Sequence, residues 1–470
     1  MANELHFPLF HGYVDRWLVS GVTETPVITK PTALHGAENE KLNTAPKDKP
    51  GEEQFKAERR AKATAWPAQL DTRPGGLVGG ADNATPFTVY WPFDDIGVTY
   101  AWDCETPACL SAWAYTELDA AEAGSVPFDL ITCGGAALWL NGEKLTEVTP
   151  YHHNEPVPTP LTLPLQKGRN KLLVFFDNYA ERDATIILRL RWKGEGTAPE
   201  QVIPVGEADA ARLAEAEHLM RSLAFHRNHF TAGPVLLDYD GADIAESYHL
   251  AFVGGTEENV KGGVLFRREA DTLPHASQIS LGDCKTFPLA FLLLQVTTEV
   301  EGIRLTRPIS VEIHTESVLP RALPTVAERK RQALELLARW GEQNTNRALA
   351  ILATGGDTAE AEKLLAVQSD YIRRRFDCSD FYLVYYPYIL RTFGKRGSGI
   401  LSEKTENELT DCLLGFRYWI DEPGNDAMWF WSENHALMFH TCQLLAGELF
   451  PDEVFTNSGL TGRQMQAKAK

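Results

Sequence analysis

The sequence predicts a multidomain protein of the mixed β and α class, in which antiparallel β-sandwich regions precede a helical region. The chain has 470 residues, more than one ordinary hydrophobic core organises. Apolar residues alternate in steps of two between short turns as far as about residue 320, and helical spacing dominates from Val326 onward. We therefore expect four parts, at residues 1–84, 85–196, 197–322 and 323–470.

The first part is expected to be an N-terminal segment with a partly disordered stretch. Residues 35–62 are highly charged and contain few apolar side chains. A segment of this composition buries too little apolar surface to offset its loss of conformational entropy on folding.

The second part, 85–196, is expected to be an antiparallel β-sandwich. Asn141 and Gly142 separate two short apolar runs and both tolerate positive φ, which predicts a two-residue hairpin turn. Farther on, Ile186, Leu188 and Leu190 alternate with other residues, which predicts a strand with one buried face.

The order LWLNG, KGRN and then an apolar strand resembles the galactose-binding-like jelly rolls attached to many glycoside-processing enzymes. This resemblance is confined to the second part of the chain. It implies a module that either binds sugar or braces a catalytic domain.

The two remaining parts are expected to differ in secondary structure. Residues 207–224 are rich in helix formers, and strand-like segments then return, so 197–322 is predicted to be a second β-rich domain. From Val326 onward, Asp357 and Glu360 form a capping-box pattern. Six helices in antiparallel hairpins are expected, at 326–341, 343–354, 358–375, 380–393, 403–420 and 431–448.

Composition excludes some classes of partner. The net charge is −19, from 45 basic and 64 acidic residues, and no basic stripe is present, so we expect no nucleic-acid binding. The strongest apolar run, 287–296, is too short to span a bilayer, so no membrane partner is expected. The sequence does not indicate an oligomeric state.

Two further features concern the compartment. The N-terminus lacks a secretory signal, so we expect a cytoplasmic protein, or an extracytoplasmic one if a signal was removed. Seven cysteines spread over the whole chain fit reduced thiols better than a disulfide framework.

The stretch MWFWSENHALMFH, 428–440, is the densest in chemically active side chains. His435 and His440 are five residues apart, roughly 140° around a helix axis, whereas metal-binding pairs are three or four apart. We therefore expect no metal site here, and no cofactor. Leu437 and Met438, with Leu444 and Leu445, are expected to form the buried stripe of this helix.

The approach to this helix concentrates acids and aromatic rings. Aromatic rings stack on the C–H faces of sugars, while carboxylates accept hydrogen bonds from sugar hydroxyls. This pattern favours a sugar-binding catalytic wall, with a packed helix junction as the alternative. The expected catalytic residues are Tyr418, Asp421, Glu422, Asp426, Glu433, Asn434 and His435, and the expected substrate-binding residues are Trp419, Trp429 and Trp431.

The β-sandwich region, the helical hairpins, the loop motif W.DEPGND.MWFWSENH and the tail LLAGELFPDEVFTNSGLTG together resemble a bacterial group. This group is related to the six-hairpin (α/α)-toroid glycosidases and polysaccharide lyases. The resemblance implies a carbohydrate-active protein without a cofactor, acting on an oligo- or polysaccharide. Of the family's catalytic residues it carries over only the pair Asn434–His435. The predicted helices are half the number in a complete toroid. We therefore expect the toroid of this chain to be incomplete and truncated at its C-terminal end.

Three functions remain open from the sequence. A glycoside hydrolase would use Glu433, buried beside Trp431, as its acid, and Asp421, Glu422 or Asp426 as its base.

A uronate polysaccharide lyase is the second. There Asn434 would bind the substrate carboxylate and His435 would remove the C5 proton. A tyrosine, either Tyr418 or one of Tyr385 and Tyr386, would donate a proton to the leaving oxygen. The third is a non-catalytic carbohydrate-binding or scaffold fragment. Hydrolysis is ranked first because nearby acids would repel a uronate.

Overall fold

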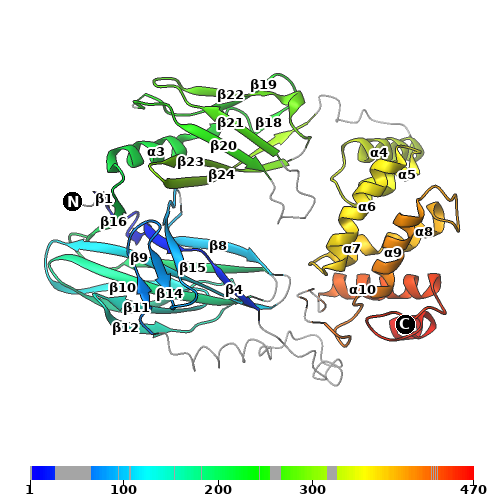
Figure 1. Cartoon of the computed structure of the whole chain (residues 1–470), viewed down its shortest axis with the longest axis horizontal. Helices are drawn as coiled ribbons and strands as arrows, with labels where there is room; N and C mark the ends of the chain where they lie inside the picture. The colour runs from blue at the N-terminus through cyan, green and yellow to red at the C-terminus, as the bar shows by residue number, and fades with distance from the viewer. Residues whose placement is uncertain are drawn as a thin grey trace.

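The computed structural model combines antiparallel β-sheets with a helical region (Figure 1). The residues that it describes are 3–26, 65–93, 95–104, 107–152, 154–180, 183–242, 244–254, 266–289, 291–314, 325–424, 426, 428, 430 and 432–470. The stretch 35–62, predicted to be partly disordered, lies outside these residues. Within them, no helix is long and apolar enough to cross a membrane.

Two sheets face each other in the first part of the chain. The larger has eleven strands: β1 (Asn3–Phe7), β3 (Trp17–Ser20), β4 (Thr23–Pro26), β5 (Gln69–Leu70), β6 (Leu77–Gly79), β7 (Thr85–Tyr90), β9 (Ala108–Ala120), β11 (Gly135–Leu140), β12 (Glu143–Val148), β14 (Gly168–Ala180) and β16 (Glu200–Gly206). The smaller has five: β2 (Tyr13–Val14), β8 (Val98–Asp103), β10 (Gly124–Thr132), β13 (Val157–Leu165) and β15 (Asp183–Trp192).

The period of two along the strands builds the sandwich core. Leu172, Val174 and Phe176 of β14 are fully buried in one core with Leu188 of β15. The predicted burial of alternate residues in β15 is confirmed for Leu188 and the two residues that share its face, but Ile187 on the other face is buried as well, at 5% exposed. Because the intervening residues of β14 are also apolar, the larger sheet buries part of its second face as well.

The predicted hairpin joins β11 to β12. Asn141 and Gly142 have φ of 53° and 90°, as a type I′ turn requires. The sandwich is also larger than expected. Strands β1, β3 and β4 come from before residue 85 and pair with β16, β7 and β9, so the sheet extends beyond the range 85–196 on both sides.

Among the described residues, the second β region contains one α-helix, one 3₁₀ helix and two small sheets. These elements are α3 (Ala210–Ser222), β17 (Ala224–Phe225), β18 (His229–Phe230), β19 (Pro234–Asp238), β20 (His249–Gly254), β21 (Phe266–Asp271), β22 (Gln278–Asp283), the 3₁₀ helix η2 (Cys284–Thr286), β23 (Phe291–Val300) and β24 (Ile303–Ile313). The helix confirms the segment predicted at 207–224.

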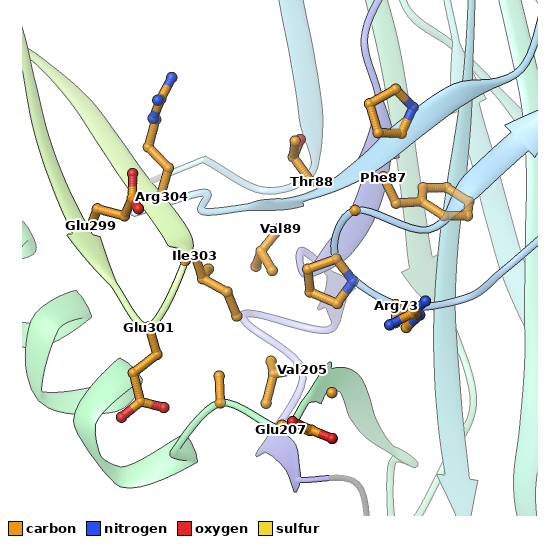
Figure 2. A pocket seen from close by; sticks show the side chains of 16 residues that line it. Arg73, Phe87, Thr88, Val89, Val205, Glu207, Glu299, Glu301, Ile303 and Arg304 are labelled. Atoms are coloured by element: carbon orange, nitrogen blue, oxygen red, sulfur yellow. The ribbon is translucent and has the colours of Figure 1, made fainter.

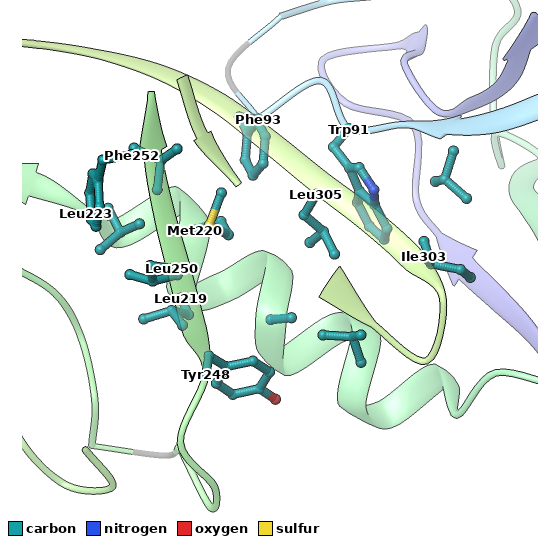
Figure 3. Packing of buried hydrophobic residues seen from close by; sticks show 14 of the residues in the cluster. Trp91, Phe93, Leu219, Met220, Leu223, Tyr248, Leu250, Phe252, Ile303 and Leu305 are labelled. Carbon is teal, nitrogen blue, oxygen red and sulfur yellow. The ribbon is translucent and has the colours of Figure 1, made fainter. Parts of the chain in front are cut away.

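A shared apolar core joins the sandwich to this second region (Figure 3). Trp91 and Phe93 follow β7 and pack with Leu219 of α3 and Leu305 of β24. The Trp91 indole Nε1 also donates to the Arg304 carbonyl at 3.1 Å. The second β region therefore covers part of the second face of the large sheet.

The last region is helical and has a core of its own. Its helices are α4 (Val326–Trp340), α5 (Thr345–Ala353), α6 (Thr358–Arg373), α7 (Ser379–Leu383), α8 (Tyr386–Phe393), α9 (Glu403–Gly415), α10 (Glu433–Leu449) and α11 (Gly462–Ala469). Helical hairpins are present, but a closed toroid is not shown.

Four local expectations for this region are wrong. The helix expected at 380–393 breaks into α7 and α8, and the one expected at 403–420 ends at Gly415. Asp357 caps α6 through the Ala359 amide, but the Glu360 carboxylate pairs with Arg347 and does not reach back. The buried face of α10 is also a different one. Leu437 is 69% exposed, and the buried residues are His435, Phe439, Cys442, Gln443, Ala446, Gly447 and Leu449.

A buried ion pair offers a test of the contact between the sandwich and α3. Arg16 lies between β2 and β3, and its Nη1 is 2.6 Å from Oε2 of Glu217 on α3, with both side chains less than one tenth exposed. Glu217→Gln removes the closer of the two carboxylates that pair with this buried guanidinium and leaves Asp15, whose Oδ2 is 3.7 Å from Arg16 Nε. The loss should lower the free energy of unfolding by about 3 kcal/mol. Chemical denaturation measures this.

The matched control is Glu269→Gln, which removes the exposed partner of Arg267. That substitution should lower the free energy of unfolding by less than about 1 kcal/mol. Equal, small effects of the two substitutions would show that the Arg16–Glu217 contact does not hold the two regions together.

Candidate functional site

The first turn of α10 presents the SENH motif in two directions. Ser432 precedes the helix, Glu433 and Asn434 are exposed, and His435 is 5% exposed. Successive residues differ by about 100° around the axis, so a helix that buries His435 turns the two preceding side chains toward solvent. The burial predicted for Glu433 is therefore wrong, and its carboxylate contacts no other described residue through a hydrogen bond or ion pair.

Glu422 is a structural carboxylate. It is 3% exposed and accepts hydrogen bonds from the Tyr418 amide at 3.0 Å and from Asn457 Nδ2 at 3.3 Å. Lys468 Nζ of α11 donates to its other oxygen at 3.0 Å. The carboxylate thus ties the α9–α10 loop to the last helix, and its predicted role as a catalytic base does not fit this environment.

Asp426 is held in a similar way. Its side chain is 6% exposed, with Oδ1 3.2 Å from Arg417 Nη1 and Oδ2 3.5 Å from Arg375 Nη1. Arg375 also donates to Asn457 Oδ1 at 2.7 Å. Two guanidinium groups hold this carboxylate inside the loop, so it too is better explained as part of the loop's structure.

Tyr418 belongs to the helical core. It is fully buried, and its hydroxyl donates to the Leu413 carbonyl at 2.7 Å. Burial raises the pKa of this phenol well above its usual value. A substrate cannot reach a group in this position, so we do not retain its expected role as a proton donor.

Of the residues predicted to form the sugar-binding wall, Trp419 and Asp421 remain at least partly accessible in the loop before α10. Trp419 is half-buried, and its ring centroid lies 4.4 Å from that of His440, with 38° between the planes. Asp421 is exposed, and its Oδ1 accepts from Lys468 Nζ at 2.7 Å. Trp429 and Trp431 lie outside the described residues.

His435 is paired with an acid that the sequence did not point to. Its Nδ1 lies 3.0 and 3.1 Å from the two carboxylate oxygens of Asp380, a fully buried residue of α7, and the Phe381 ring packs edge-on against it. Burial alone would lower the pKa of His435. Hydrogen bonds to Asp380 and Cys378, and the charges of both residues, outweigh it and raise that pKa to about 10.

Asp377 and Cys378 complete a cluster around this histidine. Cys378 Sγ, a ring nitrogen of His435 and a carboxylate oxygen of Asp377 all lie within 4.8 Å of one another. This is the one group of three such donors among the described residues that could hold a metal ion. The segment FDCSD carries a thiol between two acids, but nothing in the sequence brings it next to His435.

A separate cavity of about 880 Å³ lies between the sandwich and the second β region (Figure 2). Val89, Val205 and Ile303 form an apolar floor, and acidic side chains stand at the rim, among them Glu301. Glu301 is already engaged, because it accepts from the Asp209 amide at 2.7 Å and pairs with Arg212. None of the lining residues belongs to the helical region.

No family model and no curated protein matches the sequence. Among solved structures, Ruminococcus gnavus beta-glucuronidase is similar over 66% of this chain and 44% of its own, at 11% identity and a TM-score of 0.16. A beta-glycosidase from Bacteroides vulgatus is similar over 66% and 34%, at 9% identity and 0.16. A GH31 alpha-xylosidase from Xanthomonas citri is similar over 25% and 14%, at 17% identity and 0.14.

All three of these proteins are glycoside hydrolases by name. This chain spans less than half the length of each. TM-scores this low do not establish a shared fold.

The different roles of two neighbouring acids can be tested directly. Glu422→Gln removes a buried charge that accepts three hydrogen bonds, so the free energy of unfolding should fall by about 1.5–3 kcal/mol. Asp421→Asn removes an exposed partner of Lys468, which also pairs with Glu422, and should change the free energy of unfolding by less than about 1 kcal/mol. Denaturation curves followed by circular dichroism give both values. The structural assignment of Glu422 fails if its substitution is as mild as that of Asp421.

Proposed function

We propose that the chain belongs to a carbohydrate-active protein that hydrolyses glycosidic bonds, with the sugar bound against the α9–α10 loop and the first turn of α10. One observation supports the placement of the sugar at this helix end. Glu433 and Asn434 are exposed side by side at the start of a helix whose next residue is buried. The half-buried Trp419 ring lies in the loop that leads to this helix and supplies a surface on which a sugar ring can stack.

Glu433 is the leading candidate for the general acid. Of the four acids that the sequence singled out, Glu422 and Asp426 are buried in ion pairs, which leaves Glu433 and Asp421 accessible. A general acid must be protonated at working pH, and desolvation favours that form of a carboxyl group. Because Glu433 is exposed, a bound sugar would have to provide this desolvation. Asp421 is the corresponding candidate for the base.

Cleavage of a uronate polymer by β-elimination ranks second. Asn434 is exposed and suits recognition of a substrate carboxylate, which favours this alternative. His435, however, is 5% exposed and paired through Nδ1 with Asp380. A histidine whose pKa is raised to about 10 is protonated at neutral pH and cannot accept the C5 proton in that form.

Non-catalytic sugar binding is the third alternative, and the cavity in Figure 2 favours it. Its apolar floor and polar rim are typical of small-molecule sites between domains. In this alternative the helical region would contribute nothing to binding.

The proposal predicts separate effects for two substitutions. Glu433→Gln should leave oligosaccharide binding nearly unchanged and lower the cleavage rate about a hundredfold to ten-thousandfold, the usual contribution of a general acid. Trp419→Ala should weaken binding. Calorimetry measures binding, and reducing ends and ultraviolet absorbance, followed together on neutral and uronate-containing oligosaccharides, measure cleavage.

The matched control is Glu448→Gln, an exposed glutamate near the other end of the same helix, which should change neither quantity. New reducing ends without absorbance support hydrolysis, and a rise in absorbance supports β-elimination. Binding that survives Trp419→Ala and is lost when Val89 in the cavity is replaced by Trp would contradict the proposed site and support the third alternative.

A further inference from the structure

We propose that Asp377, Cys378 and His435 form a binding site for a transition-metal dication, with zinc as the best-suited ion. The three side chains come from two separate segments, the turn between α6 and α7 and the first turn of α10. Thiolate, imidazole and carboxylate are the three ligand types that zinc takes in proteins. The inference does not depend on the proposed sugar site.

The spacing of the donor atoms fits such an ion after a small adjustment. The three atoms lie within 4.8 Å of one another, and Cys378 Sγ is 3.4 Å from Asp377 Oδ2. Zinc bonds of roughly 2.0–2.3 Å in tetrahedral geometry place ligand atoms about 3.5 Å apart. The distance between any two donors therefore needs to shorten by about 1.3 Å at most, which rotation of side chains can supply. Three protein ligands leave a fourth position for water or another ligand.

Asp380 provides the second observation. Histidines that bind metal commonly donate their other ring N–H to a carboxylate, which fixes the ring and its tautomer. The Asp380 carboxylate lies 3.0 Å from His435 Nδ1 in this way. The metal would therefore bind through Nε2 and displace the proton on that nitrogen. Because Asp380 is fully buried, the orientation of the imidazole is set before any ion arrives.

The charges favour a cation over the competing explanation, a nucleophilic thiol activated by His435. A Cys–His–Asp arrangement does occur in enzymes that attack through sulfur. Here, however, the Asp377 carboxylate lies 3.4 Å from the sulfur, so a third donor of a type that metals take stands beside the thiol and the imidazole. Two carboxylates and a thiol around one imidazole leave excess negative charge, and a bound dication neutralises it.

Binding would join the turn before α7 to the start of α10. Cys378 in this turn has φ of 65°, an uncommon value for a residue with a side chain. An ion held there would stabilise the same helix end that presents Glu433 and Asn434. Its expected effect is therefore greater thermal stability of the helical region.

Cobalt binding to the full-length, chelator-treated chain tests the site. Co²⁺ should bind with a stoichiometry of one and produce the charge-transfer absorption of a cobalt–thiolate bond, and Zn²⁺ should displace it. Cys378→Ser should abolish that absorption, and Asp380→Asn should weaken metal binding about tenfold to a hundredfold by releasing the imidazole. Zinc should raise the melting temperature of the wild-type chain and not that of Cys378→Ser.

Cys109→Ser is the matched control, because this cysteine is also half-buried but lies on β9 in the sandwich. Cys109→Ser should leave the cobalt–thiolate absorption and the melting temperature unchanged. Circular dichroism confirms that each variant is folded. Absence of the thiolate absorption in the folded wild-type chain, or its persistence in Cys378→Ser, would overturn the inference. Rapid alkylation of Cys378 without metal binding would favour the nucleophilic thiol instead.

Discussion

The contact between Asp380 and His435 fixes the arrangement of the helical region's functional end. Both side chains are buried, one on α7 and the other on α10, and they meet at 3.0 Å. A buried charge is costly unless it is paired, so separating the two helices would leave a carboxylate and an imidazole without partners. The pair therefore sets the rotation of α10 about its axis, and that rotation turns Glu433 and Asn434 outward and brings His435 to Cys378.

Ion pairs also decide which acids of the α9–α10 loop have a structural role and which remain accessible. Glu422 and Asp426 are neutralised by Lys468, Arg417 and Arg375, which close the irregular segment between α9 and α10. The same pairs stiffen the loop that carries Trp419. The β part is built on a different constraint. Its large sheet carries apolar residues on both faces, and the second β region and α3 cover part of the second face.

Much of the secondary structure could be predicted because its signals are local. The period of two in β15, the Asn141–Gly142 turn and the helix formers of α3 each depend on neighbours in the sequence. The buried face of α10 could not be predicted, because the hydrophobic pattern favours Leu437 whereas the structure buries His435 against Asp380. The Asp377–Cys378–His435 cluster was missed for the same reason, since no spacing rule brings residues from two distant segments together.

The protonation of the two ring nitrogens of His435 is the most direct test of this account, and long-range nitrogen–proton NMR correlations of the imidazole ring measure it. The account predicts that Nδ1 carries a proton held by Asp380, and that addition of zinc shifts Nε2 while Nδ1 keeps its proton. It also predicts that Asp380→Asn removes the strongly hydrogen-bonded character of the Nδ1 proton. An unprotonated Nδ1, or a ring whose signals are the same with and without Asp380, would show that this pair does not organise the site.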